Sequence, residues 1–377
     1  MKPLHVLHVV GARPNFMKIA PILHAAQGSP GLRATLVHTG QHYDEKMARL
    51  FFEELAIPRP DVDLEVGSAS HAQQTALILT RFEPVLLERR PDLVLVVGDV
   101  NSTLACSLCA SKLGIPVAHV EAGLRSFDRT MPEEINRLVT DAVADLLFVS
   151  EPSGLANLKQ EGVPEGKVHF VGNVMIDTLR AQLPRAKATD ALRRNGLEPR
   201  GYALLTLHRP SNVDEPASLA RVLGPILELC RQMPVLFPVH PRTRERLARS
   251  GLSAPGLRTV EPLGYLEFLG LLAEARLALT DSGGIQEETT VLGIPCITLR
   301  ENTERPVTVT HGTNVLAGTD PARIRAAIAA ALEAPPIVQE PPPMWDGHAA
   351  ERIVEVLEGF RAAADRSETR GSPTSSR

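Results

Sequence analysis

The sequence has little cysteine, few aromatic residues and no long apolar run. Four cysteines in 377 residues are too few for a disulfide framework, which agrees with a reducing compartment. No stretch approaches the about 18 consecutive apolar residues of a membrane-spanning helix. The start, Met1–His5, lacks an apolar segment followed by a small-residue cleavage site. We therefore predict a cytoplasmic protein that does not associate with membranes.

The sequence has no excess of basic residues. The formal net charge is -4, from 40 basic and 44 acidic residues. Such a balance provides no field that would attract nucleic acid or an anionic membrane surface, so any affinity for phosphate must be local. Cys106 and Cys109 form an isolated CxxC among small residues of an expected helix. That context predicts buried packing and argues against a zinc or redox site.

What the chain does have is an alternation of short β-branched runs with stretches of helical length. A chain of 377 residues is long for one core and fits two domains. The alternation predicts buried parallel strands, and therefore an α/β fold with two Rossmann-like doubly wound domains facing a central cleft. The predicted strands are Leu4–Val10, Thr35–Thr39, Leu93–Val97, Val117–Val120, Leu146–Val149, Val168–Val171, Ala203–Leu207, Val235–Val239, Leu277–Thr280 and Cys296–Leu299.

Polar and proline-rich intervals indicate the domain limits. The strand pattern restarts near Tyr202 after a charged stretch, and residues 334–343 contain too much proline for a helix or a central strand. We predict an N-terminal domain over 1–172, a C-terminal domain over 173–346, a helix over 347–365 that returns to the first domain, and a frayed tail over 366–377.

Candidate site residues in the first half follow predicted strands, where open parallel sheets bind ligands. Arg13 and Lys18 come after the first strand, and the G-x-G-x-x-G spacing of a dinucleotide-binding turn is absent. Asp99 and Glu121 end two later strands and would suit an acid/base pair, although a strand-end Asp caps a helix equally well. Glu133 opens a helix, where spacing alone favours interaction with the helix dipole.

In the second half, the most informative segment is Asp281–Glu288. A strand followed by Ser282, Gly283 and Gly284 and then a helix can present backbone amides to a diphosphate. Glu288 lies too deep in that helix for capping and would suit a pair of ribose hydroxyls. His208 follows another strand, and Arg305 follows a further one as a second possible phosphate ligand.

Taken in order, these segments closely resemble the motifs of the non-hydrolysing UDP-N-acetylglucosamine 2-epimerases. The resemblance extends over residues 5–318, and the ordered set is far more specific than any one motif. The segments that carry it are Gly11–Pro14, Thr39–His42, Gly98–Asp99, His119–Arg125, Pro132–Arg137, Asp281–Glu288 and Thr303–Pro306.

The resemblance implies a GT-B-type fold, a homodimer, a UDP-sugar substrate, and no metal or other cofactor. It also implies interconversion of UDP-GlcNAc and UDP-ManNAc, through elimination of UDP to a 2-acetamidoglucal and re-addition. Carried over by position, Asp99, Glu121 and Glu133 resemble the catalytic carboxylates, and Arg13, Lys18 and His208 other essential residues. The positions that resemble UDP contacts are Ser282, Gly283, Gly284, Glu288 and Arg305.

Several alternatives remain open at the level of sequence. A related enzyme could epimerise a modified UDP-HexNAc, such as a diacetamido uronic acid, or could hydrolyse UDP-GlcNAc to free ManNAc and UDP. A glycosyltransferase of the same fold would require an acceptor, and a UDP-sugar sensor would need no acids. Exchange of the C2 hydrogen with solvent in the absence of an acceptor distinguishes the epimerase from the last two.

Overall fold

The computed structural model describes residues 2–41, 45–239, 241–333 and 340–370. The chain divides into two compact units. Unit 1 comprises Met1–Thr178 and Met344–Arg377, and unit 2 comprises Leu179–Pro343. The first change of unit falls inside a continuous helix, α7 (Val174–Lys187), close to the predicted limit at residue 172.

Unit 1 contains a sheet of parallel strands in the order β3-β2-β1-β4-β5-β6-β7. The strands are β1 (Leu4–Val10), β2 (Leu32–His38), β3 (Val62–Asp63), β4 (Leu93–Val97), β5 (Val117–Val120), β6 (Leu146–Val149) and β7 (Val168–Phe170). Every residue of β1, β4, β5 and β6 is buried, as expected for strands covered on both faces. The strand order is that of a doubly wound Rossmann-like fold.

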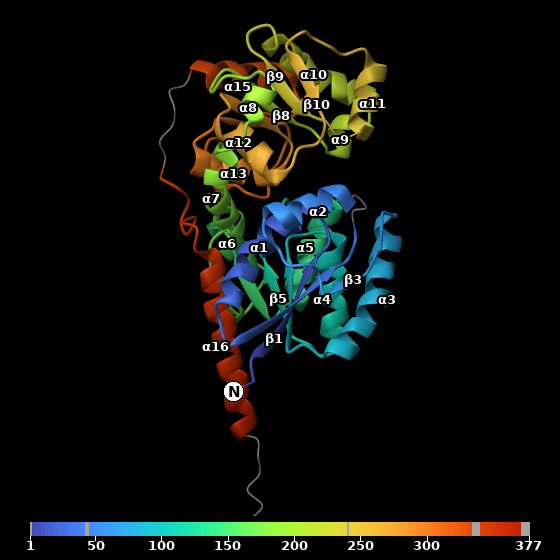
Figure 1. The fold of residues 1–377 in the computed structure, drawn as a ribbon, viewed down its shortest axis with the longest axis vertical. Coiled ribbons are helices and arrows are strands. Elements are labelled where there is room, and N and C mark those ends of the chain that lie inside the picture. Colours follow the sequence, from blue (N-terminus) through green and yellow to red (C-terminus); the bar gives the residue numbers. More distant parts are fainter. Residues whose placement is uncertain (1, 42–44, 240, 334–339, 371–377) are drawn as a thin grey trace, which may run out of the picture. The chain divides into compact units, whose positions relative to one another are not determined.

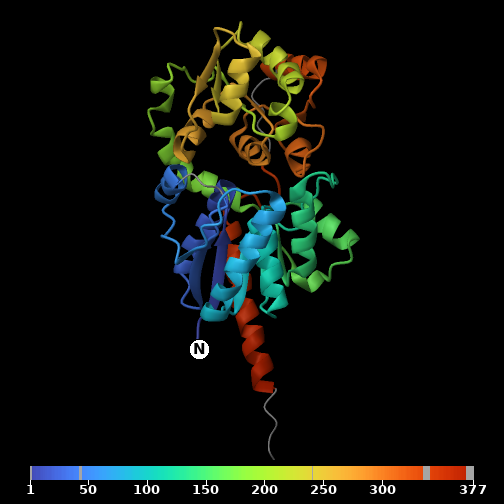
Figure 2. The same ribbon diagram turned by 90° about the vertical axis from the view of Figure 1, so that its right-hand side faces the viewer.

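Helices cover both faces of this sheet, with α1 and α16 on one side and α3 and α4 on the other (Figures 1 and 2). They are α1 (Arg13–Gln27), α2 (Glu45–Glu54), α3 (His71–Arg89), α4 (Asn101–Lys112), α5 (Pro132–Val143), α6 (Pro152–Gln160), the 3₁₀ helix η1 (Glu165–Lys167), α7 and α16 (Ala349–Arg370). In the described part of the chain, no helix is long and apolar enough to cross a membrane. Cys106 and Cys109 are both buried in α4, where they pack in the core of unit 1.

Unit 2 repeats the same topology with a parallel sheet in the order β10-β9-β8-β11-β12-β13. Its strands are β8 (Ala203–Thr206), β9 (Val235–Pro238), β10 (Leu257–Val260), β11 (Leu277–Thr280), β12 (Cys296–Thr298) and β13 (Asn314–Leu316). Its helices are α8 (Ala191–Arg194), α9 (Pro210–Val213), α10 (Pro216–Leu229), α11 (Pro241–Ser250), α12 (Tyr265–Ala273), α13 (Gly283–Leu292), α14 (Val307–Thr310) and α15 (Pro321–Glu333).

The strands that the sequence did not predict lie at the edges of the two sheets. They are β3, β10 and β13, each at one end of its strand order. Edge strands are covered on fewer sides, and most residues of β3 and β10 are partly exposed, so neither forms a continuous apolar run. The pattern of buried β-branched residues therefore detects the central strands and misses three of the four edge strands; the fourth, β7, was predicted as Val168–Val171.

The final helix differs from its prediction. α16 continues to Arg370, beyond the predicted helix end at residue 365, and residues 371–377 lie outside the described part. The segment 361–370 is rich in Ala and Arg, which favour helix. The start of α16 is held by the rest of unit 1. The carboxylate of Asp177 accepts hydrogen bonds from the backbone amides of Ala349 (3.2 Å) and Ala350 (2.7 Å).

Candidate active site

The chain reverses its direction of winding between β1 and β4 in unit 1, and between β8 and β11 in unit 2. Ligands of open α/β sheets bind at such switch points, beyond the carboxyl ends of the strands. The predicted site residues follow these strands. Arg13 and Lys18 lie on the helix after β1, and Asp99 and Glu121 come after β4 and β5.

A buried ion pair joins two of these residues in unit 1. The ammonium group of Lys18, on α1, contacts the carboxylate of Glu121, and the two side chains are 6% and 3% exposed. The backbone of Glu121 is left-handed (φ 73°), a costly conformation for a residue with a side chain. Gly98 has a left-handed backbone (φ 69°), which favours glycine, and a Cβ there would lie 2.9 Å from the Lys18 nitrogen.

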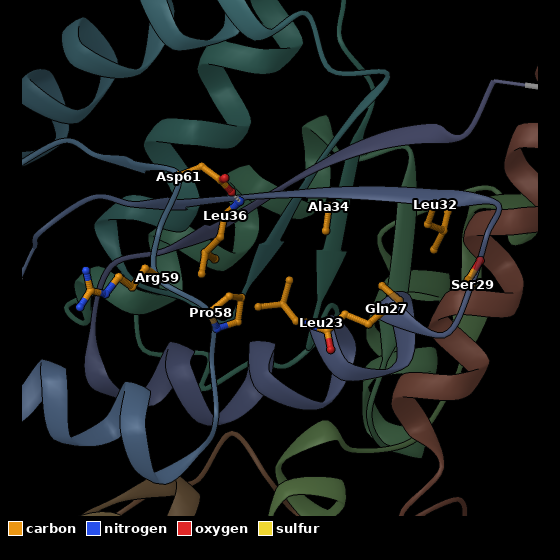
Figure 3. A pocket seen from close by; sticks show the side chains of 10 residues that line it. Leu23, Gln27, Ser29, Leu32, Ala34, Leu36, Pro58, Arg59 and Asp61 are labelled. Atoms are coloured by element: carbon orange, nitrogen blue, oxygen red, sulfur yellow. Dashed lines mark hydrogen bonds between the residues drawn. The ribbon is translucent and has the colours of Figure 1, made fainter.

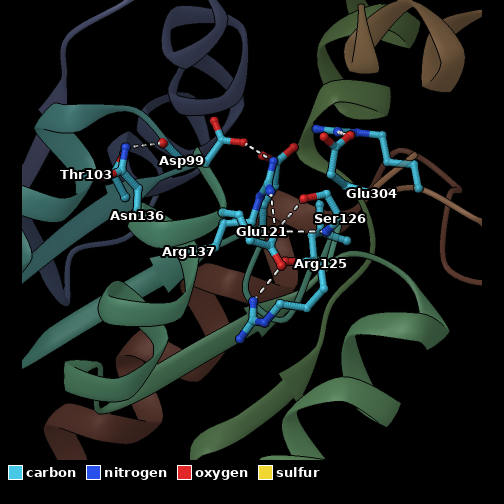
Figure 4. Close-up of polar contacts among 12 residues, drawn as sticks. Asp99, Thr103, Glu121, Arg125, Ser126, Asn136, Arg137 and Glu304 are labelled. Atoms are coloured by element: carbon cyan, nitrogen blue, oxygen red, sulfur yellow. Dashed lines mark hydrogen bonds and ion pairs between the residues drawn. The ribbon is translucent and has the colours of Figure 1, made fainter. Parts of the chain in front are cut away.

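Asp99 is held by a second cation. Arg137, on α5, contacts the Asp99 carboxylate at 2.5 Å and the Glu134 carboxylate at 2.9 Å (Figure 4). Glu134 in turn accepts hydrogen bonds from the backbone amides of Ser126 (2.8 Å) and Phe127 (3.0 Å). One arginine thus links the acid after β4 to the loop that precedes α5.

His119, on β5, contacts the turn after β4 that carries Gly98 and Asp99. Its Nδ1 lies 2.6 Å from the carboxylate of Asp141, and its Nε2 lies 2.8 Å from the carbonyl oxygen of Gly98. Burial alone would raise the pKa of Asp141, but the charges and hydrogen bonds of His119 and Arg125 lower it below its ordinary value. His119 thus connects Asp141 to the turn after β4.

The other predicted residues of unit 1 are less enclosed. Arg13 is the first residue of α1, and Glu133 lies in the first turn of α5; both are partly exposed. Glu133 is the direct neighbour of Glu134, which is buried, so the two acids of this turn have different environments. His42, in one of the motifs, lies outside the described residues.

In unit 2, His208 pairs with a buried acid. Asp281 is fully buried, and its carboxylate lies 2.9 Å from Nδ1 of His208, whose side chain is 57% exposed. The same carboxylate accepts hydrogen bonds from the backbone amides of His208 (3.1 Å) and Arg209 (2.9 Å). The His208 side chain is therefore fixed at the carboxyl end of β8, next to the end of β11.

The glycine turn predicted to bind phosphate opens α13, which starts at Gly283 directly after Ser282. The guanidinium of Arg305 packs over this start: its Cζ would lie 2.8 Å from a Cβ at Gly283. Arg305 is buried and contacts the carboxylates of Glu287 (2.7 Å) and Glu304 (3.3 Å). The backbone amides of Gly283 and Gly284 thus lie in the first turn of a helix beside a fixed cation.

Glu288 lies on the buried side of α13. Its Oε1 accepts a hydrogen bond from the Tyr265 hydroxyl at 3.0 Å, and the side chain is 3% exposed. Burial raises the pKa of Glu288 to about 7; the Tyr265 hydrogen bond opposes this shift, and the charge of Glu287 adds to it. This carboxyl group therefore changes charge near neutral pH.

Sequence reasoning missed the partners that hold these side chains: Arg137, Glu134, His119, Asp141, Asp281, Glu287 and Tyr265. Most of them stand inside the quoted motifs, but nothing in the spacing shows which acid meets which cation. Within the described residues, no group of His, Cys, Asp and Glu is arranged to hold a metal ion.

A cavity of about 340 Å³ in unit 1 is separate from these residues (Figure 3). It lies between the end of α1 and β2, and its lining includes Leu23, Leu36 and Pro58. None of the predicted site residues lines it, so it does not contribute to the candidate site.

A family model described as UDP-N-acetylglucosamine 2-epimerase matches residues 24–358. The chain belongs to this family. It is 41% identical over 361 residues to the UDP-N-acetylglucosamine 2-epimerase of Methanococcus maripaludis, covering 93% of this chain and 97% of that one. It is also 41% identical to a UDP-2,3-diacetamido-2,3-dideoxy-D-glucuronate 2-epimerase of Pseudomonas aeruginosa, covering 94% of this chain and 99% of the relative.

Solved structures of the UDP-N-acetylglucosamine 2-epimerase family have the same fold. The Methanocaldococcus jannaschii enzyme in complex with UDP-GlcNAc and UDP superposes with a TM-score of 0.88 at 42% identity, covering 94% of this chain and 99% of that one. The predicted fold of two Rossmann-like domains of the GT-B type is thereby confirmed. The protein is an epimerase, as the motifs predicted.

Proposed function

We propose that this epimerase interconverts UDP-GlcNAc and UDP-ManNAc by inverting C2 of the sugar. One observation above all supports a C2 reaction: Asp99 and Glu121 follow the adjacent strands β4 and β5, and each is held by a buried cation. Removing a weakly acidic C2 hydrogen requires carboxylates fixed beside that carbon. Relatives that are 41% identical and carry this name support the substrate.

The proposed reaction has two halves. In the first, a carboxylate removes the C2 hydrogen while the bond between C1 and the UDP oxygen breaks, leaving a 2-acetamidoglucal and UDP. In the second, UDP adds back to C1 and an acid protonates C2 from the opposite face. We assign Asp99, Glu121 and Glu133 to the proton transfers at C2. Lys18 and Arg13 would stabilise the negative charge that develops on the substrate.

Unit 2 would bind the UDP portion. Backbone amides of Gly283 and Gly284 at the start of α13, the Ser282 side chain and the guanidinium of Arg305 would supply donors to a diphosphate. The backbone amide of Ser282 itself donates to the Thr280 hydroxyl at 2.9 Å. Glu288 would accept hydrogen bonds from the ribose hydroxyls when it is ionised. We propose that the reaction needs no metal or nicotinamide cofactor, because carboxylates can transfer both protons and the cations can stabilise the charge that develops.

A second candidate substrate is a UDP-2,3-diacetamido uronic acid. The specific observation in its favour is the Pseudomonas aeruginosa relative, which is as similar to this chain as the UDP-GlcNAc enzyme of Methanococcus maripaludis. The chemistry at C2 would be the same for both substrates. Comparing kcat/KM for the two purified UDP-sugars decides between them.

The decisive experiment is an NMR time course of UDP-GlcNAc with purified enzyme in deuterated water, without any acceptor. We expect UDP-ManNAc to appear and deuterium to enter C2 of both sugars. If neither UDP-sugar substrate gave epimer or C2 exchange, the proposal would be wrong. Accumulation of free ManNAc with UDP would instead identify a hydrolysing enzyme.

We also propose that the enzyme works as a cytoplasmic homodimer. The basis is the family resemblance of its motifs. Sedimentation velocity on the purified protein tests the oligomeric state, and cell fractionation tests the location. A monomer at assay concentration would contradict the first part.

A further inference from the structure

The carboxylate of Asp281 has more hydrogen-bond donors around it than a strand-end acid needs for capping. It accepts from the backbone amides of His208 (3.1 Å) and Arg209 (2.9 Å) and from the side-chain amide of Asn212 (3.1 Å). Its remaining contact is Nδ1 of the His208 ring, at 2.9 Å. The first three contacts organise the turn after β8, and the fourth is to a ring that is more than half exposed.

The direction of this fourth contact follows from the chemistry of the two groups. Burial would raise the pKa of Asp281, but the charge and hydrogen bond of His208, with the amide donors, lower it below its ordinary value. An ionised carboxylate only accepts hydrogen bonds, so Nδ1 of His208 must carry the hydrogen. Nε2, on the far side of the ring, is then the nitrogen that gains and loses a proton. The ring is 57% exposed, which leaves it accessible.

The His208–Asp281 pair lies next to the turn proposed above to bind the diphosphate of the substrate. Asp281 directly precedes Ser282 and Gly283, the turn proposed above to bind phosphate. β8 and β11 pair in register, with Thr206 opposite Thr280. His208 and Ser282, each two residues beyond these partners, therefore lie at neighbouring strand ends. An imidazole held there by a buried acid would face the bridging oxygen of the leaving group.

We propose that Asp281 is a positioning residue that keeps one hydrogen on Nδ1 of His208, so that the doubly protonated ring gives its second proton, from Nε2, to departing UDP. This rests on the proposed function. As the C1–O bond breaks, its electron pair stays on the β-phosphate oxygen, and the Nε2 proton moves to that oxygen. The C2 hydrogen leaves as a proton to one of the carboxylates assigned above. In re-addition the proton on UDP returns to Nε2, an acid protonates C2 from the opposite face, and Nδ1 keeps its hydrogen throughout.

The first test is Asp281→Asn. An asparagine still accepts from the backbone amides through its oxygen, but its amide group can donate to Nδ1 and so reverse the tautomer of His208. We expect kcat to fall by at least about 100-fold, because the same change in Ser-His-Asp triads lowers kcat about 10⁴-fold through the wrong tautomer. The Kd for UDP should stay within about threefold, since the change affects proton transfer and not ground-state binding.

A double-mutant cycle separates positioning from a merely structural role. If Asp281 acts through His208, adding Asp281→Asn to His208→Gln should cost no further activity, because the ring that Asp281 orients is already absent. Independent, multiplicative losses would overturn the proposal. Asp190→Asn is the matched control: it makes the same substitution at an acid paired with Arg193 and Arg194 on α8, so kcat should stay within about threefold.

A third measurement needs no variant. ¹⁵N NMR of the wild-type enzyme, at a pH where the His208 ring is neutral, should show the hydrogen on Nδ1, and UDP should perturb Nε2. A hydrogen on Nε2 would overturn the proposal even if Asp281→Asn fails to fold. Loss of all turnover in the wild type would count against the proposed function alone, because the tautomer is measured independently of activity.

Discussion

At the scale of single residues, Glu288 carries the clearest dependence on pH. Burial raises the pKa of its carboxyl group to about 7, so the free enzyme holds it protonated below that pH and ionised above it. A ribose diol donates hydrogen bonds and therefore prefers the ionised form. We expect the Kd for UDP to rise as pH falls below about 7, approaching tenfold per pH unit. Titration calorimetry between about pH 8 and about pH 5.5 measures this.

The control for Glu288 is Glu288→Gln, which cannot ionise. This variant should bind UDP more weakly above neutral pH and should lose the part of the pH dependence that belongs to the carboxyl group. Any slope that both proteins share comes from UDP or from other groups. Identical pH profiles in the two proteins would contradict a role for Glu288 in binding.

Gly283 supports a second prediction at this scale. A Cβ at this position would lie 2.8 Å from Cζ of Arg305, whose guanidinium is buried between two acids and cannot move away easily. Gly283→Ala should therefore displace Arg305 and weaken UDP binding by about tenfold or more, equivalent to the about 1–3 kcal/mol of an overpacked site. Gly224→Ala is the control, because a Cβ at Gly224 of α10 meets nothing within 4 Å. Calorimetry with UDP compares the two variants; equal affinities would contradict the prediction.

At the scale of elements, one side chain from elsewhere in unit 1 caps the start of α16. The carboxylate of Asp177 accepts from the first backbone amides of α16 at 2.7 and 3.2 Å, in the manner of a helix cap supplied by another segment. Asp177→Ala should lower the free energy of unfolding by about 1–2 kcal/mol. Asp190→Ala is the control: Asp190 precedes α8, but its side chain caps no amide there. Urea unfolding followed by circular dichroism should show that the free energy of unfolding of this control falls by less than about 0.5 kcal/mol. Equal losses of unfolding free energy in Asp177→Ala and Asp190→Ala would show that the Asp177 cap does not stabilise the start of α16.

At the scale of the whole molecule, the single tryptophan reports on one unit. Trp345 is buried in unit 1, and its indole nitrogen donates to the carbonyl oxygen of Ser150 at 2.9 Å. Each unit has its own core, so we expect the unfolding transition seen by tryptophan fluorescence to differ from that seen by circular dichroism. UDP at 100 times its Kd should stabilise the unit that binds it by about 2.7 kcal/mol.

If unit 2 binds UDP, the ligand should shift the circular dichroism transition and leave the fluorescence transition in place. Gly283→Ala provides the control, since its circular dichroism transition should respond less to UDP. Coincident transitions that shift together would show that the two units unfold as one.

Local sequence determined the strands and the position of the candidate residues along the chain. Leu4–Val10, Leu93–Val97 and Leu277–Thr280 match their predictions at both ends, because a central parallel strand must be apolar on both faces. The ends of these strands also located Asp99 and the turn before α13. Edge strands such as β3 were missed because partial exposure removes that pattern.

Only the tertiary structure decided which charged groups meet. Arg137 reaches Asp99 across 38 residues, and Tyr265 reaches Glu288 across 23. The environment that raises the pKa of Glu288 and the acid that orients His208 follow from the same long-range order of strands. The physical reason is that secondary structure depends on neighbours in sequence, whereas ion pairing and burial depend on strand order. Nothing in the spacing of residues encodes that order by itself.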